Sequence, residues 1–119
     1  MGDFRKLVVW QRARELDQVV YGLSSRFPSG ERFGLTEQTR KAAASITANI
    51  AEGCGRNTDR ELARFLRISL GSANELENHL MRSQDPGFVA DEAIKPLINE
   101  LHEIKGMLAS FIRSLGSAD

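Results

Sequence analysis

Apolar residues recur every three or four positions near the C-terminus, and the two step lengths alternate without a break. This run comprises Ile94, Leu97, Leu101, Ile104, Leu108, Phe111 and Leu115. Such spacing keeps one face of an α-helix apolar over several turns, so the helix needs partner helices to cover that face. A second run near the N-terminus has the same period and comprises Val9, Ala13, Leu16, Val20, Leu23 and Phe27. Together the two runs predict an all-helical bundle.

Segments rich in glycine and proline divide the chain into four predicted helices. These segments read PSGERFG over 28–34, GCG over 53–55 and DPG over 85–87. The predicted helices cover roughly residues 6–27, 37–52, 58–83 and 91–115. Short links make successive helices antiparallel neighbours. The sequence therefore predicts one all-α domain over residues 1–119, folded as an antiparallel up-down-up-down four-helix bundle.

The residues at the predicted helix ends favour particular caps. Thr36 is expected to cap the second helix at its N-terminus, and Asn57 or Thr58 to cap the third. A glycine of the GCG segment suits the left-handed conformation in which many helices end. Pro96 falls inside the last predicted helix and removes one backbone donor. Two alternatives follow: the helix begins near Lys95, or it runs through Pro96 with a kink or a loosened first turn.

Small side chains are unusually frequent on the second helix, and the third helix carries a glycine in its interior. Glycine costs a helix about 1 kcal/mol relative to alanine, so this glycine is expected to have a packing role. Small residues let two helix backbones approach closely, either within the bundle or between subunits. The apolar runs and these small residues offer more contact faces than one chain is expected to cover. Helix packing and subunit contact are therefore predicted at Ala44, Ala48, Ala51 and Gly71.

Composition places few further limits on function. The chain has 119 residues, with 16 basic and 16 acidic side chains and a formal net charge of +0. The lone cysteine, Cys54, cannot form a disulfide within the chain, which indicates a reducing compartment. No apolar run is long enough to span a membrane, and no apolar leader is recognisable at the start. We therefore expect a cytoplasmic protein with no membrane partner.

Charge is unevenly distributed along the chain. Residues 1–67 hold 12 Lys and Arg against 8 Asp and Glu, whereas residues 68–119 hold 4 against 8. Four arginines, Arg56, Arg60, Arg64 and Arg67, follow one another at steps of four, four and three, so one side of a helix can carry them. A line of guanidinium groups can follow a phosphate backbone. The alternative is that these arginines pair with nearby carboxylates on a solvated surface.

No catalytic motif is apparent. Di-iron bundles carry a Glu-x-x-His pair on each of two helices, whereas the glutamates before His79 and His102 lie two positions away. Cys54 lies at the C-terminal end of a predicted helix, where the helix dipole disfavours a thiolate. The sequence thus predicts a non-enzymatic protein without catalytic residues, metal or cofactor, and a buried, unreactive Cys54.

Four stretches of the sequence resemble a known family over nearly the whole chain. They read LVVWQRA over 7–13, RFGLTEQ over 32–38, AASITANIAEGCGR over 43–56 and RFLRISLGSANELE over 64–77. The family comprises bacterial four-helix-bundle proteins first noted as reading frames within intervening sequences of large-subunit ribosomal RNA genes. It is similar in turn to the accessory protein of diversity-generating retroelements, a basic pentameric barrel that binds nucleic acid and reverse transcriptase.

The resemblance implies self-association into a ring, with a homopentamer as the expected form. By analogy it also implies RNA, or a protein that processes nucleic acid, as a partner. Two classes of function remain open at this point. One is a homo-oligomer whose basic face binds structured RNA, and the other is a protein–protein assembly or adaptor protein with no nucleic-acid role.

Overall fold

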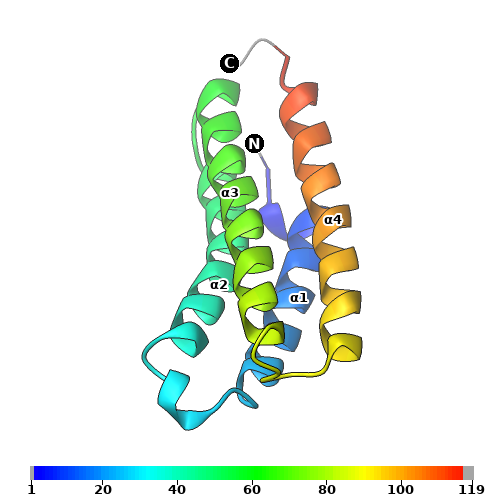
Figure 1. Ribbon diagram of the computed structural model, residues 1–119. Helices are drawn as coiled ribbons and strands as arrows, with labels where there is room; N and C mark the ends of the chain where they lie inside the picture. Colours follow the sequence, from blue (N-terminus) through cyan, green and yellow to red (C-terminus); the bar gives the residue numbers. More distant parts are fainter. Residues whose placement is uncertain (1, 117–119) are drawn as a thin grey trace.

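Four long helices lie side by side in the computed structural model, which describes residues 2–116 (Figure 1). They are α1 (Val8–Ser24), α2 (Leu35–Cys54), α3 (Asp59–Gln84) and α4 (Asp91–Ser114). Two short 3₁₀ helices, η1 (Phe4–Lys6) and η2 (Ser29–Glu31), precede α1 and α2. The described residues contain no strand. None of the helices in this part of the chain combines the length and apolar composition needed to cross a membrane.

Each helix packs against the helices before and after it, and α1 closes the bundle against α4. The contact between α2 and α3 is the most extensive, and that between α1 and α4 is the smallest of the four. Successive helices run in opposite directions, as Figure 1 shows. The predicted all-α, antiparallel up-down-up-down bundle is therefore confirmed.

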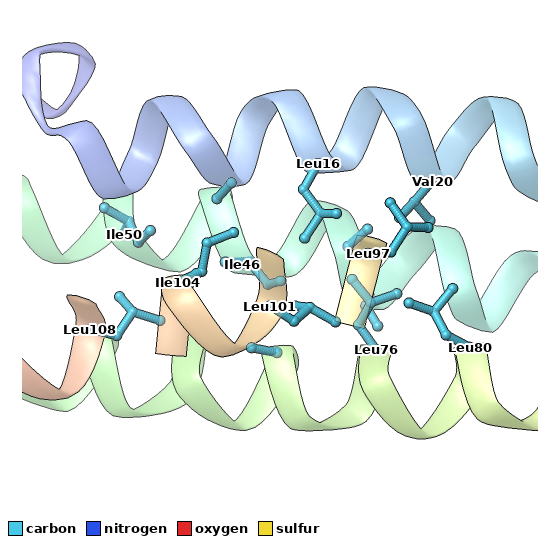
Figure 2. Close-up of a cluster of buried hydrophobic side chains, with 14 of the residues drawn as sticks. Leu16, Val20, Ile46, Ile50, Leu76, Leu80, Leu97, Leu101, Ile104 and Leu108 are labelled. Carbon is cyan, nitrogen blue, oxygen red and sulfur yellow. The ribbon is translucent and has the colours of Figure 1, made fainter. Parts of the chain in front are cut away.

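The two apolar runs meet in the core. Every member of the N-terminal run is buried, as are the members of the C-terminal run from Ile94 to Leu108. Figure 2 shows Leu16, Ile46, Leu76 and Leu101 pointing into the space between the helices. Only Phe111 and Leu115 of the C-terminal run are half-buried. One chain thus covers both runs except at Phe111 and Leu115, the last two positions of the C-terminal run, so the apolar runs leave little uncovered surface for a second subunit.

The start of α2 differs from the prediction, whereas the start of α3 agrees with it. Helix α2 begins at Leu35 with Gly34 as its N-cap, so Thr36 lies inside the helix and does not cap it. The Leu35 side chain is buried in the core, and its burial places Leu35 itself in the first turn of α2. The hydroxyl of Thr58 accepts a hydrogen bond from the Glu61 backbone N–H at 3.1 Å and caps α3 as expected.

A glycine in the left-handed conformation ends α3, whereas none ends α2. Gly55 has φ −84°, so the expected left-handed end of α2 is wrong. Gly87 has φ 76°, and its N–H donates to the Gln84 carbonyl while the Phe88 N–H donates to the Ser83 carbonyl. These two bonds form a Schellman motif, which reverses the chain between α3 and α4.

Helix α4 runs through Pro96 without interruption from Asp91. The alternative start near Lys95 is therefore wrong. The Ala93 N–H donates to the Ala90 carbonyl at 3.0 Å, three residues back, so the first turn is of the tighter 3₁₀ type. This start keeps Ile94 fully buried and in phase with the rest of the apolar run.

Of the glycines on the helices, Gly53 leaves the least room for a side chain. A Cβ atom placed there would lie 3.0 Å from the Phe65 Cβ and 3.3 Å from the Leu62 carbonyl oxygen. At Gly71 a Cβ atom would have nothing within 4 Å. The expected intrachain crossing at Gly71 is therefore wrong, because Gly71 lies on the exposed side of α3.

Polar side chains join the helices around the core. Arg12 on α1 forms a bidentate ion pair with Glu100 on α4, with N···O distances of 2.6 and 2.9 Å. Lys105 on α4 forms an ion pair with Glu77 on α3 and donates to the Asn74 side-chain oxygen at 3.0 Å. The pair of Arg12 and Glu100 joins the basic part of the chain to the acidic part, so some of the uneven charge is neutralised within one bundle.

Candidate nucleic-acid interface

Three of the four candidate arginines lie along the exposed side of α3, and the fourth precedes the helix. Arg60, Arg64 and Arg67 are all exposed, and their spacing places them on one face of α3. Arg56 is also exposed and lies in the short link between α2 and α3. The structure therefore brings the four cations to one end of the bundle, around the first turns of α3.

Two of these arginines are held by carboxylates and by an aromatic ring. The Arg56 guanidinium lies 2.9 Å from a Glu52 carboxylate oxygen, and that of Arg64 lies 3.1 Å from Glu61. Both guanidinium groups also lie over the Phe65 ring, at 4.7 and 4.4 Å from its centroid. Exposed ion pairs of this kind are weak, so the carboxylates reduce the positive charge of the surface without locking the arginines.

The pKa of Glu61 reports the positive field of this surface. The hydrogen bond from Arg64 lowers the pKa of the Glu61 carboxyl below its ordinary value of 4.5, and the charges of Arg56 and Arg60 lower it further. Three of the four candidate arginines thus act on one carboxylate. These three arginines therefore lie close together around the start of α3.

The small residues expected at a packing interface lie largely on the surface of the chain. Ala44 and Ala48 on α2 are exposed, Ala51 is half-buried, and Gly71 on α3 is exposed. Ser45 and Ser72, joined by a 2.9 Å hydrogen bond, connect α2 to α3 nearby. The small residues thus face away from the core, and their predicted role in subunit contact remains a prediction.

A second group of cations lies at the opposite end of α2 and was not singled out from the sequence. Arg32, Arg40 and Lys41 line an open hollow together with the exposed Phe33, and Arg40 also lies over Tyr21. The signal for this group was an apolar aromatic residue, Phe33, inside the polar PSGERFG segment. The exposure of Phe33 could not be predicted from the sequence, because the apolar residues on either side of it, Phe27 and Leu35, are buried.

The cysteine and the two histidines have different surroundings in the bundle. Cys54 is buried as predicted, and burial raises the pKa of its thiol. His79 is buried beside Arg82 and Glu75, whereas His102 is exposed 3.6 Å from Glu77. Within residues 2–116, no three His, Cys, Asp or Glu side chains lie close enough together to hold a metal ion.

An open hollow of about 560 Å³ lies between the N-terminal end of α1 and the C-terminal end of α4. Its lining includes the apolar side chains of Leu7, Val8, Met107 and Phe111. Val8 is 56% exposed, and Phe111 belongs to the part of the α4 run that is only half-buried. The α1–α4 contact is therefore incomplete at this end of the bundle.

These features define an antiparallel four-helix bundle with a basic surface around the start of α3. The family model described as 23S rRNA-intervening sequence protein matches residues 5–110, and the chain belongs to this family. A search of curated proteins finds no match.

A solved structure supports the same fold. It is the crystal structure of a protein of unknown function from the S23 ribosomal protein family of Bacteroides thetaiotaomicron VPI-5482. Its similarity to this chain has a TM-score of 0.82 and 25% sequence identity, covering 88% of this chain and 98% of that chain. Neither the family description nor that of the solved structure names an enzymatic activity.

Proposed function

We propose that the protein is a non-enzymatic homo-oligomer that binds structured RNA through the surface formed by Arg56, Arg60, Arg64 and Arg67. The observation that carries this proposal is the line of exposed guanidinium groups on one face of α3. Guanidinium groups bind phosphate oxygens with paired hydrogen bonds, and a line of them can follow a phosphate backbone without reading bases. The resemblance to a nucleic-acid-binding pentameric barrel favours the same ligand.

Self-association would strengthen such binding. The exposed small residues Ala44, Ala48 and Gly71 would allow helices of neighbouring subunits to approach closely. A ring, with a pentamer as the expected form, would repeat the α3 surface around a circle. Weak contacts at each copy would then act together on one RNA through a high effective concentration.

The test replaces Arg60 and Arg64 by glutamate and measures binding of a blunt RNA duplex of mixed sequence over a range of salt concentrations. Loss of two phosphate contacts should weaken binding and reduce the slope of log affinity against log salt by about 2. The matched control replaces Lys95 and Arg113, two exposed cations of α4, by glutamate. It makes the same change in net charge, and its affinity should exceed that of the α3 variant.

The variant must first assemble like the wild type in light scattering, because these arginines could instead pair between subunits. Equal RNA affinity of the α3 variant and the wild type would contradict the proposal.

An assembly or adaptor protein with no nucleic-acid role is the second candidate. The ion pairs of Arg56 with Glu52 and of Arg64 with Glu61 favour it, because they reduce the charge available to phosphate. A wild-type protein that assembles but binds no RNA at low salt would support this candidate over the first.

A further inference from the structure

The end of the bundle where α1 leads into α2 exposes two aromatic rings. Phe33 is 81% exposed and Tyr21 is 59% exposed. A phenylalanine that contributes to folding is normally buried, because its ring gains stability by leaving water. Phe33 therefore contributes little to the core and is available to a ligand.

Cations flank both rings. The Arg32 guanidinium lies 5.2 Å from the centroid of the Phe33 ring, and the Arg40 guanidinium lies 3.8 Å from that of Tyr21. Arg40 is also fixed by hydrogen bonds to the Ser24 and Ser25 hydroxyls at 2.8 and 3.0 Å. A guanidinium held in this way loses little further freedom when a ligand binds.

The positive charges of Arg32, Arg40 and Lys41 are not neutralised by direct ion pairs with described carboxylates. Arg40 donates only to neutral oxygens, and no described carboxylate forms an ion pair with Arg32, Arg40 or Lys41. This sets them apart from Arg56, in the link before α3, and Arg64, on α3, which both form ion pairs with carboxylates. The positive charge at this end of the bundle is therefore more available to an anionic ligand.

An open hollow of about 520 Å³ lies between these side chains. Its lining comprises Arg32, Phe33, Thr36, Glu37, Arg40 and Lys41. This volume is within the range of small-ligand sites, and three cations face one carboxylate, that of Glu37. The hollow thus combines a flat apolar ring with a net positive charge.

We propose that this surface binds an unpaired nucleotide segment of RNA, with a base stacked on Phe33 and phosphates paired with Arg32 and Lys41. Exposed aromatic rings within a basic groove are the usual platform for unpaired bases. A base within a duplex is already stacked and cannot reach the ring. An acidic peptide would use the cations but would leave the flat ring without a planar partner.

This site deepens the proposed function, on which its choice of RNA as ligand rests, by adding an unpaired segment to the structured RNA held at α3. Phe33 lies before the start of α2, and Arg56 lies just after its end. The 20 residues of α2 span about 30 Å, so one RNA could contact both surfaces.

The test measures binding of hexauridylate, a short unpaired RNA, to the wild type and to three variants at Phe33. Phe33→Ala should weaken binding by at least about 5-fold, which is the smaller end of the effect of losing one stacked base. Phe33→Leu keeps apolar bulk without a flat ring and should lose nearly as much, whereas Phe33→Trp should retain binding. Met81→Ala, at an apolar side chain that is 51% exposed on α3, is the control and should bind like the wild type.

Three results would overturn the proposal. The first is a wild type that does not bind hexauridylate, and the second is equal binding by Phe33→Ala or Phe33→Leu and the wild type. The third is a change of oligomeric state in Phe33→Ala, measured by light scattering. Such a change would show that the Phe33 side chain makes a contact between copies of the chain.

The same measurements separate this site from the α3 surface. Loss of duplex binding in the Arg60→Glu and Arg64→Glu variant, with unaltered hexauridylate binding in Phe33→Ala, would refute the Phe33 site alone. The reverse pattern, duplex binding that survives the α3 replacements and hexauridylate binding that needs Phe33, would refute the α3 surface alone.

Discussion

Gly53 on α2 lies so close to Phe65 on α3 that a methyl group has no free space between them. The Cβ atoms of the two residues would be 3.0 Å apart if Gly53 were alanine, and the Leu62 carbonyl oxygen would be 3.3 Å from the new atom. The Phe65 Cβ and the Leu62 oxygen belong to or adjoin the backbone of α3, so they cannot move away as the tip of a side chain can. The absence of a side chain at Gly53 therefore determines how closely α2 and α3 pack.

Gly53→Ala should lower the free energy of unfolding by about 1–3 kcal/mol, because the helices must separate to admit the methyl group. Gly22→Ala is the matched control, since an added Cβ at this exposed position of α1 meets nothing within 4 Å. It should raise stability by up to about 1 kcal/mol through helix propensity. Denaturant unfolding measures both changes, and a stabilised Gly53→Ala protein would refute the close approach.

The two threonines near helix starts should differ in their contributions to stability. Thr58→Ala removes the acceptor for the Glu61 N–H and should cost about 1 kcal/mol. Thr36→Ala should change stability little, because Thr36 lies within α2 and makes no cap. Thermal unfolding of the two variants measures the difference. An equal loss of stability in both variants would indicate that Thr36 does cap α2.

Stability at low pH should depend on the pair formed by Glu77 and Lys105. The hydrogen bond from Lys105 lowers the pKa of Glu77 below its ordinary value of 4.5. A lowered folded-state pKa gives stability that is present above pH 4.5 and is lost as the pH falls through the lowered value. Glu77→Gln should therefore cost about 1 kcal/mol at neutral pH and nothing in strong acid.

A double-mutant cycle tests whether Lys105 is the cause. Glu77→Gln should have little effect on unfolding in a Lys105→Met background at any pH. An undiminished effect there would assign the stabilisation to another partner of Glu77.

Ala48→Leu and Gly71→Leu test the contact between subunits. Both positions are exposed, and at Gly71 the space for a side chain is open, so each single chain should still fold with unchanged helicity. At a close crossing between subunits the added side chain would cost about 1–3 kcal/mol and shift the oligomer towards smaller species. Light scattering at matched protein concentration measures this shift. A wild-type protein with the mass of one 13.2 kDa chain would refute self-association itself.

The bundle could be predicted from the sequence because two signals agreed along most of the chain. The spacing of apolar residues predicted the helices, and the segments rich in glycine and proline predicted the links between them. The apolar run from Ile94 to Leu108 specifies a helix face whatever its neighbours are, and Asp85-Pro86-Gly87 marks a reversal through local backbone preference alone. The start of α2 could not be predicted in the same way. Thr36 and Gly34 are both acceptable caps, and burial of Leu35 in the folded core selects Gly34.

The candidate surfaces were harder to predict, because exposure is a property of the assembled bundle. The spacing of Arg60, Arg64 and Arg67 predicted a common face, and the structure places them on one. The same reasoning could not distinguish Gly53 from Gly71, since a glycine has no side chain whose polarity reveals its surroundings. Only the position of α3 shows that Gly53 faces a neighbour and Gly71 does not.

The incomplete contact between α1 and α4 has a consequence for the order in which the chain acquires its structure. This contact joins the first and last long helices, whereas the extensive α2–α3 contact joins helices adjacent in sequence. Local contacts form faster than distant ones, and a growing chain presents its N-terminal elements first. The contact between α2 and α3 can therefore form before α4 packs against α1. In native-state hydrogen exchange, the amides of α2 and α3 should be the last to open, and those beside Val8 and Phe111 among the first.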